Sequence, residues 1–272
     1  MPVPGMHDAG SKSLLNGYQP MAGLSPQVDL AGALNNLATH PNTAPFISKQ
    51  FIERLVKSNP SPAYVARVAS AFAQSGGDMP TMLTAILLDQ EARANDAGGN
   101  DQATDGHLQE PALMFPAYIR ALGGQNTAAN YYGNVMASMG EDIFNAGSVF
   151  NYDAPSWVVD GTGGLLGPEF QINTPNAAIL RENMVASFFN QYSNPVQSYG
   201  PTSVDLSPFI PLAANPSTLM NALDLTLTHG TMPAAMKQII LAAITADSLS
   251  SLDRVETGIY LILTSSYYNV WH

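Results

Sequence analysis

Carboxylate side chains gather in and beside the stretch 140–174, where two of them would suit hydrolysis of a glycosidic bond. Glycoside hydrolases use one carboxyl group as the acid and another as nucleophile or base. We select Glu169, Asp153 and Glu110 as candidate catalytic residues. The alternative is structural, because an Asp or Glu beside proline serves equally well in a turn or at a helix start. The full set is Glu110, Glu141, Asp142, Asp153, Asp160 and Glu169.

Aromatic side chains share this stretch and would complete a carbohydrate site. Aromatic faces stack on sugar rings, so Trp157, Tyr152 and Phe150 are the candidate substrate-binding residues. The alternative is that the apolar residues of 140–174 pack onto a helical core and order the loop. Those residues are Phe144, Val149, Phe150, Trp157, Leu165, Leu166 and Phe170.

A polar loop at 94–107 offers oxygen ligands to a hard cation. Its candidate ligands are Asp96, Asn100, Asp101 and Asp105, and such oxygen donors favour calcium. The spacing is not that of an EF-hand, because Gly98 stands where the second ligand belongs. A solvated acidic loop is the alternative to calcium as a cofactor.

Two histidines stand near the start of the chain. His7 precedes Asp8, with Lys12 nearby, and such a pair suits a base with its orienting carboxylate or two metal ligands. Adjacent residues of an extended arm point apart, so the structural alternative is a salt bridge that ties the arm down. His40 suits the end of a preceding helix, where the helix dipole favours a cation.

Composition restricts the partners. The chain has 10 Lys and Arg against 21 Asp and Glu, and this net charge of −11 argues against nucleic acid and anionic membrane. No run of about eighteen apolar residues is present, so we expect no membrane span. Charged residues make up 11% of the chain, well below the roughly 25% of an average soluble chain. Such a surface is commoner in exported proteins, so we expect a periplasmic or extracellular location, although no signal peptide is visible.

Several catalytic classes lack their motifs. The absence of cysteine excludes disulfides and thiolate metal sites. No G-x-S-x-G elbow, H-E-x-x-H pair, Walker loop or G-x-G-x-x-G turn occurs in the sequence.

Helical periodicity and capping residues predict a mainly α protein. A multi-helix globular domain over 25–272 follows an extended arm at 1–24 and contains two long ordered loops, 140–174 and 193–215. Its central three-helix unit covers about 42–93, with Ser61 and Asp78 as helix caps. Further helices are expected at about 25–39, 110–122, 126–139 and 175–192, and three more at about 216–265. In the helix at 25–39 we expect Val28, Leu30, Leu34 and Leu37 to point inward, and we expect Asn126 to cap the helix that it begins. A short hairpin across Gly161–Gly164 is the main strand signal.

Three blocks of sequence together resemble a known family. They are HPNTAPFISKQFIERLVKSNPSPAYVARVASAF with GGDMPTMLTAILLDQEAR, GSVFNYDAP with GLLGPEFQI, and RVETGIYLILTSSYYNVW. In this order they resemble the bacterial domain-of-unknown-function family eighteen hundred. The resemblance implies an exported protein, often encoded beside a sulfatase-like protein, and no established reaction.

The resemblance also implies a longer protein with an N-terminal Trp-His-Asn-His-Phe-like motif. Because that motif is absent here, we expect the chain to correspond to the C-terminal half only. The stretch before Glu110 departs from the family pattern as well, since Asp105–Gln109 lacks the usual basic residues. Any role that needs a cation there is in doubt.

Two classes of function follow from these patterns. The first is an enzyme acting on extracellular polysaccharide. The second is a non-catalytic scaffold or binding module that partners carbohydrate or a sulfatase-like protein, and the chain is a candidate homo-oligomer. Whether Glu169, Asp153 and Glu110 converge on one cleft discriminates between the two classes.

Overall fold

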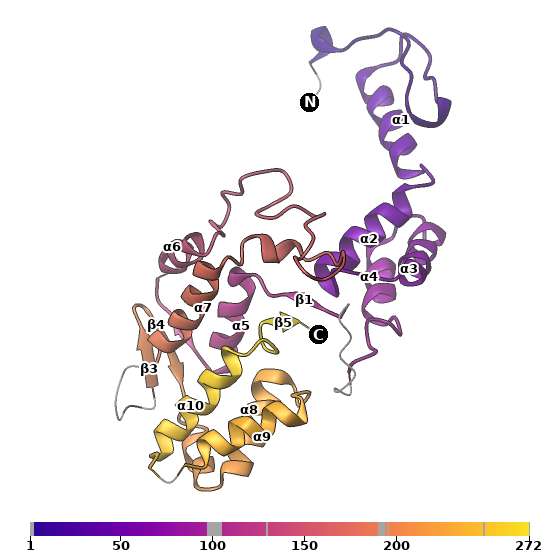
Figure 1. Cartoon of the computed structure of the whole chain (residues 1–272). Coiled ribbons are helices and arrows are strands. Elements are labelled where there is room, and N and C mark those ends of the chain that lie inside the picture. The colour runs from indigo at the N-terminus through magenta and orange to yellow at the C-terminus, as the bar shows by residue number, and fades with distance from the viewer. Residues whose placement is uncertain are drawn as a thin grey trace. The chain divides into compact units, whose positions relative to one another are not determined.

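The computed structural model describes residues 3–96, 105–128, 130–189, 194, 196–246 and 248–271. The chain forms two compact units, one made of 1–55 and 60–93 and the other of 56–59 and 94–272. Ten α-helices and a few short strands occur within the described residues, which confirms the mainly α prediction (Figure 1). None of these described helices combines the length and apolar character needed to cross a bilayer. The single domain predicted over 25–272 stays a prediction.

The first unit contains four α-helices. They are α1 (Pro26–Ala38), α2 (Thr43–Leu55), α3 (Pro62–Gln74) and α4 (Met79–Leu87), and two short 3-10 turns, Pro4–Met6 and Leu15–Gly17, precede them. Ser25, Ser61 and Asp78 accept hydrogen bonds from backbone amides at the starts of α1, α3 and α4. Each cap satisfies a donor that the first helical turn leaves without a partner, so these predicted starts are confirmed.

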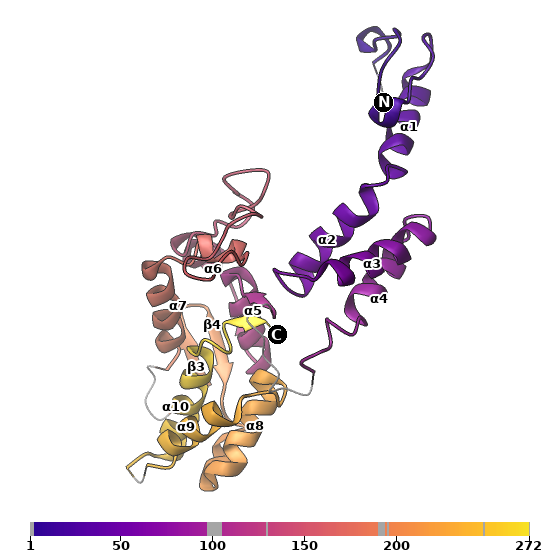
Figure 2. The same ribbon diagram turned by 45° about the vertical axis from the view of Figure 1, so that its right-hand side comes forward.

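Helices α2, α3 and α4 pack together around a small apolar core, as predicted. The buried side chains of this core are Ile52, Tyr64, Val68, Ala69, Met82 and Ile86. Both views show α1 extending away from this cluster (Figure 2). Its apolar residues were expected to point inward, and that is wrong: Val28, Leu30, Leu34 and Leu37 are exposed. The described arm covers α1 mainly with polar contacts, which leaves these side chains in water.

The second unit carries the larger core. Its helices are α5 (Pro111–Ala121), α6 (Asn130–Ser138), α7 (Pro175–Ser187), α8 (Pro216–Thr228), α9 (Ala234–Ile244) and α10 (Ser251–Leu263). Helices α8, α9 and α10 pack against one another, and α10 also contacts α7. Gly258 allows the close approach of α10 to α8, because a Cβ there would stand 2.7 Å from Leu223 Cδ1. One apolar cluster joins buried hydrophobic side chains of α5, α7, α8 and α10, among them Met114, Val185, Leu223 and Ile259.

Two small antiparallel sheets complete this unit. In one, β1 (His107–Leu108) pairs with β5 (Val270–Trp271). In the other, β4 (Thr202–Asp205) lies between β2 (Gln125–Asn126) and β3 (Val196–Tyr199). The predicted irregular loop at 193–215 is therefore wrong where it contains the β3–β4 hairpin. Asn126 was expected to cap a helix, but it pairs with Thr202, and α6 begins four residues later.

The stretch 140–174 is held by local hydrogen bonds more than by apolar packing. The Val159 amide donates to the Leu165 carbonyl and the Gly167 amide to the Trp157 carbonyl, which forms the predicted hairpin across 161–164. The expected packing of Phe144, Val149 and Phe150 onto the core is wrong. Phe144 and Val149 are almost fully exposed, and Phe150 is 59% exposed. Phe144 lies at a bend closed by the hydrogen bond from the Asn145 amide to the Asp142 carbonyl. Val149 and Phe150 lie in the next turn, which the bond from the Asn151 amide to the Ser148 carbonyl closes.

Candidate ligand-binding site

A pocket of about 280 Å³ opens in the second unit between α7 and the end of α10. Most of its wall is apolar. The lining residues are Leu108, Met114, Phe170, Asn173, Ala178, Arg181, Glu182, Leu263, Thr264, Ser266, Asn269 and Val270. They come from β1, α5, α7, α10 and β5, and from the 3-10 turn Pro168–Gln171 and its neighbours. A concave apolar cavity with a few polar groups is the usual form of a small-molecule site.

The β1–β5 pair fixes one side of this pocket. The Gln109 amide donates to the Asn269 carbonyl at 2.8 Å, and Gln109 Nε2 donates to the Tyr268 carbonyl at 2.8 Å. Gly106 precedes the pair with φ +69°, and a Cβ there would stand 1.6 Å from the Trp271 carbonyl oxygen. Only glycine allows the backbone to come this close to Trp271. Gly106 therefore permits the β1–β5 pairing, which places Asn269 and Val270 in the lining of the pocket.

Arg181 is the charged group buried in the wall, with 4% of its surface exposed. Its Nη1 donates to the Gln109 carbonyl at 2.7 Å. Its Nε and Nη2 are buried and have no hydrogen-bond partner within the described part of the chain. Burial lowers the pKa of Arg181 to about 10, and the charges of Glu141 and Glu110 oppose that shift. The side chain is still cationic at neutral pH.

Two amide oxygens on the same wall also have unused bonding capacity. Asn173 Oδ1 and Asn269 Oδ1 are buried and have no donor among the described residues. The Asn269 side chain is held in place because its Nδ2 donates to the Ser265 carbonyl at 2.8 Å. A buried polar atom without a partner costs about 1–3 kcal/mol, so each of these atoms favours a ligand that supplies the missing bond.

A buried carboxylate stands near Arg181 at the start of α5. Glu141 is 3% exposed, and its Oε2 accepts a hydrogen bond from the Ala112 amide at 2.8 Å. Burial raises the pKa of Glu141 to about 7, and the nearby charges of Glu110 and Asp153 raise it further, while the Ala112 bond opposes the shift. Glu141 therefore gains or loses its proton near neutral pH. Its bond to the Ala112 amide also caps the first turn of α5.

A second buried pair joins β1 to the 3-10 turn. His107 Nδ1 lies 3.6 Å from Glu169 Oε1, and both side chains are almost fully buried. The His107 ring meets Trp271 edge to face, with centroids 5.4 Å apart. This contact joins β1 to the 3-10 turn Pro168–Gln171.

Two of the predicted catalytic residues, Asp153 and Glu169, belong to the stretch 140–174, and the third, Glu110, immediately precedes α5. Asp153 and Glu110 lie within electrostatic range of Glu141, whereas Glu169 lies beside His107. Glu169 and Asp153 are buried and Glu110 is half-buried at the start of α5. None of the three lines the pocket. Their catalytic roles stay predictions.

The predicted aromatic residues lie apart from this pocket as well. Trp157 and Phe150 are 40% and 59% exposed, and Tyr152 donates a hydrogen bond to the Asp142 carbonyl. The aromatic side chain that does line the pocket is Phe170, which is 38% exposed. The sugar-binding roles of Trp157, Tyr152 and Phe150 stay predictions.

The predicted calcium ligands are only partly described. Asp96 is exposed, whereas Asp105 forms an ion pair with the buried Lys57, at 2.9 Å between Nζ and Oδ1. Asn100 and Asp101 lie outside the described residues. Within the described ranges no three metal-binding side chains of the His, Asp or Glu type come together. Calcium binding stays a prediction.

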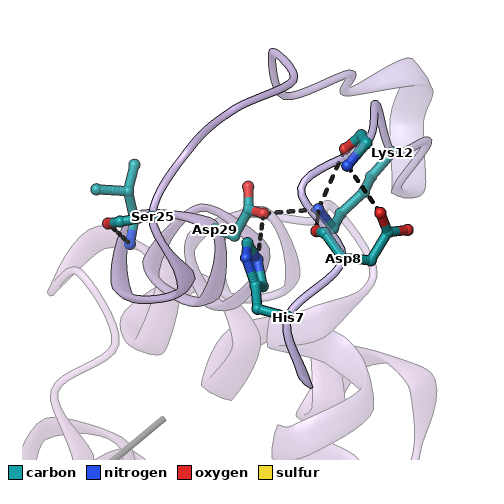
Figure 3. Close-up of polar contacts among 7 residues, drawn as sticks. His7, Asp8, Lys12, Ser25 and Asp29 are labelled. Carbon is teal, nitrogen blue, oxygen red and sulfur yellow. Dashed lines mark hydrogen bonds and ion pairs between the residues drawn. The ribbon is translucent and has the colours of Figure 1, made fainter. Parts of the chain in front are cut away.

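His7 and His40 both have structural contacts, and Figure 3 shows those of His7. His7 Nε2 lies 2.8 Å from Asp29 Oδ2, and Lys12 Nζ donates to the same oxygen at 2.6 Å. The Lys12 hydrogen bond lowers the pKa of Asp29. Asp8 instead accepts from the Gly10 amide, so it does not orient His7, and the arm is tied to α1. His40 Nδ1 accepts from the Asn42 amide at 3.2 Å in the turn after α1.

Arg181 belongs to none of the sequence patterns that predicted the site, although its position in the helix marks it. Ala177, Met184, Val185 and Phe188 form the buried face of α7, and Arg181 stands on that same face at helical spacing. A charged side chain on the apolar face of a helix needs an ion pair, hydrogen bonds or a ligand to offset the cost of its burial. Its presence there therefore indicates a candidate binding site. Asn173 and Asn269 had no such signal, because they reach the pocket from segments far apart in the sequence.

Comparison with known proteins gives a family but no activity. The model of the family described as Protein of unknown function (DUF1800) matches residues 2–270. No curated protein and no solved structure matches the chain.

Proposed function

This chain belongs to the DUF1800 family, and we propose that it is an exported protein that binds carbohydrate polymer through the pocket of its second unit. The observation that carries the proposal is the pocket itself, which combines an apolar wall with amide and charged side chains. Its volume of about 280 Å³ lies at the small end of ligand pockets, which suits one sugar unit of a chain.

The wall matches the chemistry of a sugar ring. A sugar presents C–H faces and hydroxyl groups, and Leu108, Phe170 and Leu263 offer apolar surface to the former. Asn173 and Asn269 offer amide oxygens that lack donors among the described residues, and hydroxyl groups donate to such oxygens. The opening of the pocket towards solvent lets a polymer continue beyond the bound unit.

Binding is favoured over cleavage because a catalytic group has to reach the reacting bond. Glu169, Asp153 and Glu110 do not line the pocket. A binding module would hold the polymer for a separate enzyme. The sulfatase-like protein that the resemblance implies is a partner of the right kind.

A second candidate function is hydrolysis of the polysaccharide, and Glu141 is the observation that favours it. Its pKa of about 7 suits a general acid at neutral pH, and Asp153 and Glu110 lie within electrostatic range as partners. For this function the substrate has to reach Glu141, whose side chain is buried.

The test compares polysaccharide binding with sugar release. Affinity electrophoresis of the full chain through gels containing acidic and neutral polysaccharides detects binding, and a reducing-end assay detects cleavage. Ala178→Phe places a ring in the pocket, and Ile179→Phe is the matched control because Ile179 is exposed and does not line the pocket. We expect retardation that Ala178→Phe abolishes and Ile179→Phe keeps. Retardation that survives Ala178→Phe would exclude this pocket, and reducing ends released in a Glu141-dependent way would favour hydrolysis.

A further inference from the structure

Three residues that line the pocket have unused hydrogen-bonding capacity. Arg181 has two N–H donors without a partner, and Asn173 and Asn269 each have a carbonyl oxygen without a donor, within the described residues. All three side chains line the same pocket. A ligand that satisfies them together needs a paired acceptor for the arginine and hydroxyl donors for the two amides.

The two unused nitrogens of Arg181 form one edge of its guanidinium group. Nε and Nη2 lie side by side on that edge, and their N–H bonds point in parallel, which matches the two oxygens of a carboxylate. The third nitrogen, Nη1, is held by the Gln109 carbonyl. The orientation of the guanidinium is therefore set before any ligand binds.

The same chain shows what this edge does elsewhere. In the first unit, Arg67 Nε donates to Asp89 Oδ2 and Arg67 Nη2 donates to Asp89 Oδ1, each at 2.7 Å. Arg67 thus uses for its own carboxylate the edge that Arg181 leaves unused.

Resting on the function proposed above, we infer that the sugar bound in this pocket is an acidic one, whose carboxylate pairs with Nε and Nη2 of Arg181 while its hydroxyl groups donate to Asn173 and Asn269. A uronic acid fits this description. The chemical class is narrower than carbohydrate in general, because a neutral sugar leaves the Arg181 edge unsatisfied.

Acidic side chains near the site restrict how the ligand binds. Glu141 and Glu110 lie within electrostatic range of Arg181, but Nε and Nη2 donate a hydrogen bond to neither. Glu182 is exposed and lines the pocket, and the whole chain carries a net charge of −11. Approach of an anion is therefore opposed over long range, so the affinity has to come from the local pair with Arg181. The two nitrogens and the two amide oxygens are all buried, so the side chains covering them have to move apart when the sugar enters.

The test measures the affinity of the full chain for glucuronate, glucose, acetate and sulfate by titration calorimetry near pH 7. Arg181→Lys keeps the charge but removes the paired edge, and Arg120→Lys is its control on an exposed arginine. Asn173→Asp adds a negative charge to the lining of the pocket, which would repel the carboxylate of the sugar. Asn183→Asp is its control, because Asn183 lies on the exposed side of α7. Circular dichroism checks that every variant is folded. If Arg181→Lys does not fold, the affinity of Asn173→Asp for glucuronate tests the proposal instead.

We expect glucuronate to bind about tenfold more tightly than glucose, since a bidentate charged pair is roughly twice as strong as neutral hydrogen bonds. Arg181→Lys and Asn173→Asp should each weaken glucuronate binding about tenfold, whereas both controls keep it. Equal affinity for glucose and glucuronate, unchanged in Arg181→Lys, would overturn the acidic class and leave the carbohydrate function standing.

The remaining outcomes separate the two proposals. Acetate binding that depends on Arg181, without binding of either sugar, would support the carboxylate site and overturn the carbohydrate function. Tighter binding of sulfate than of acetate and glucuronate would overturn the carboxylate class. Binding of none of the four probes to the folded protein would overturn both.

Discussion

Glu141 couples the stability of the second unit to pH, because its carboxyl group is buried and caps α5. Its folded pKa is about 7 against an ordinary value of 4.5. A raised pKa means that the folded state holds the proton more tightly, so the stabilisation is full below about pH 4.5 and is lost as the pH rises through about 7. A shift of this size corresponds to roughly 3 kcal/mol.

We expect Glu141→Gln to remove the contribution of Glu141 to the pH dependence, because glutamine keeps an oxygen for the Ala112 amide and never ionises. Urea unfolding between pH 4.5 and pH 8 measures the effect. Glu256, whose pKa burial also raises to about 7, leaves a residual slope of the same sign. Glu182→Gln, on an exposed glutamate, is the control. A variant as pH-sensitive as the original chain would contradict the assignment.

The sequence predicted the carboxylates that lie near Glu141, but it did not predict the polar residues that line the pocket. The carboxylates of 140–174 and Glu110 were selected by type, and two of them do lie within range of Glu141. The wall was missed because Asn173, Arg181 and Asn269 meet only through the packing of α7 on α10 and the β1–β5 pair. Local patterns carry no information on contacts of that sequence separation.

Among the elements, the strand pair β1–β5 depends on one glycine. Gly106 has φ +69°, and a Cβ would stand 1.6 Å from the Trp271 carbonyl oxygen, so alanine cannot be accommodated without displacing β5. We expect Gly106→Ala to lower the free energy of unfolding by about 2–4 kcal/mol, combining backbone strain with loss of the pairing. Gly163→Ala separates the two effects, because Gly163 has φ +74° and no atom within 4 Å.

That control should cost only the strain, about 1–2 kcal/mol. Thermal unfolding of both variants provides the comparison. Equal losses in the two variants would show that the contact with Trp271 contributes nothing. Weaker glucuronate binding in Gly106→Ala but not in Gly163→Ala would link the strand pair to the pocket wall, since Asn269 and Val270 reach it through β5.

Helices were predicted well because their signals are local. Ser25, Ser61, Asp78, Thr174, Asn215 and Ser250 all accept backbone hydrogen bonds at helix starts. The β3–β4 hairpin was missed because its alternation covers only four residues on each strand. Its further pairing with β2 joins residues far apart in the sequence, and this contact overrides the capping signal of Asn126.

On the scale of the whole molecule, α1 exposes apolar side chains to solvent. All residues of α1 are described and none of them is buried. Leu30, Leu34 and Leu37 recur at helical spacing and are 60%, 56% and 52% exposed. Isolated helices shorter than about 12–15 residues are marginal in water, so α1 gains stability from any surface that covers these leucines.

We therefore expect the chain to self-associate through α1, which would make it the homo-oligomer that the sequence analysis proposed as a candidate. Replacing Leu30, Leu34 and Leu37 together with glutamine should shift the mass measured by light scattering towards the monomer and reduce binding of an apolar dye. The melting temperature of the monomer should hardly change, since exposed substitutions usually alter stability by less than about 0.5 kcal/mol. Replacing Ala31, Asn35 and Ala38 of the same helix with glutamine is the control, because it changes exposed residues other than the leucines. A chain that is monomeric at every concentration and binds no dye would show that the leucines of α1 have no self-partner.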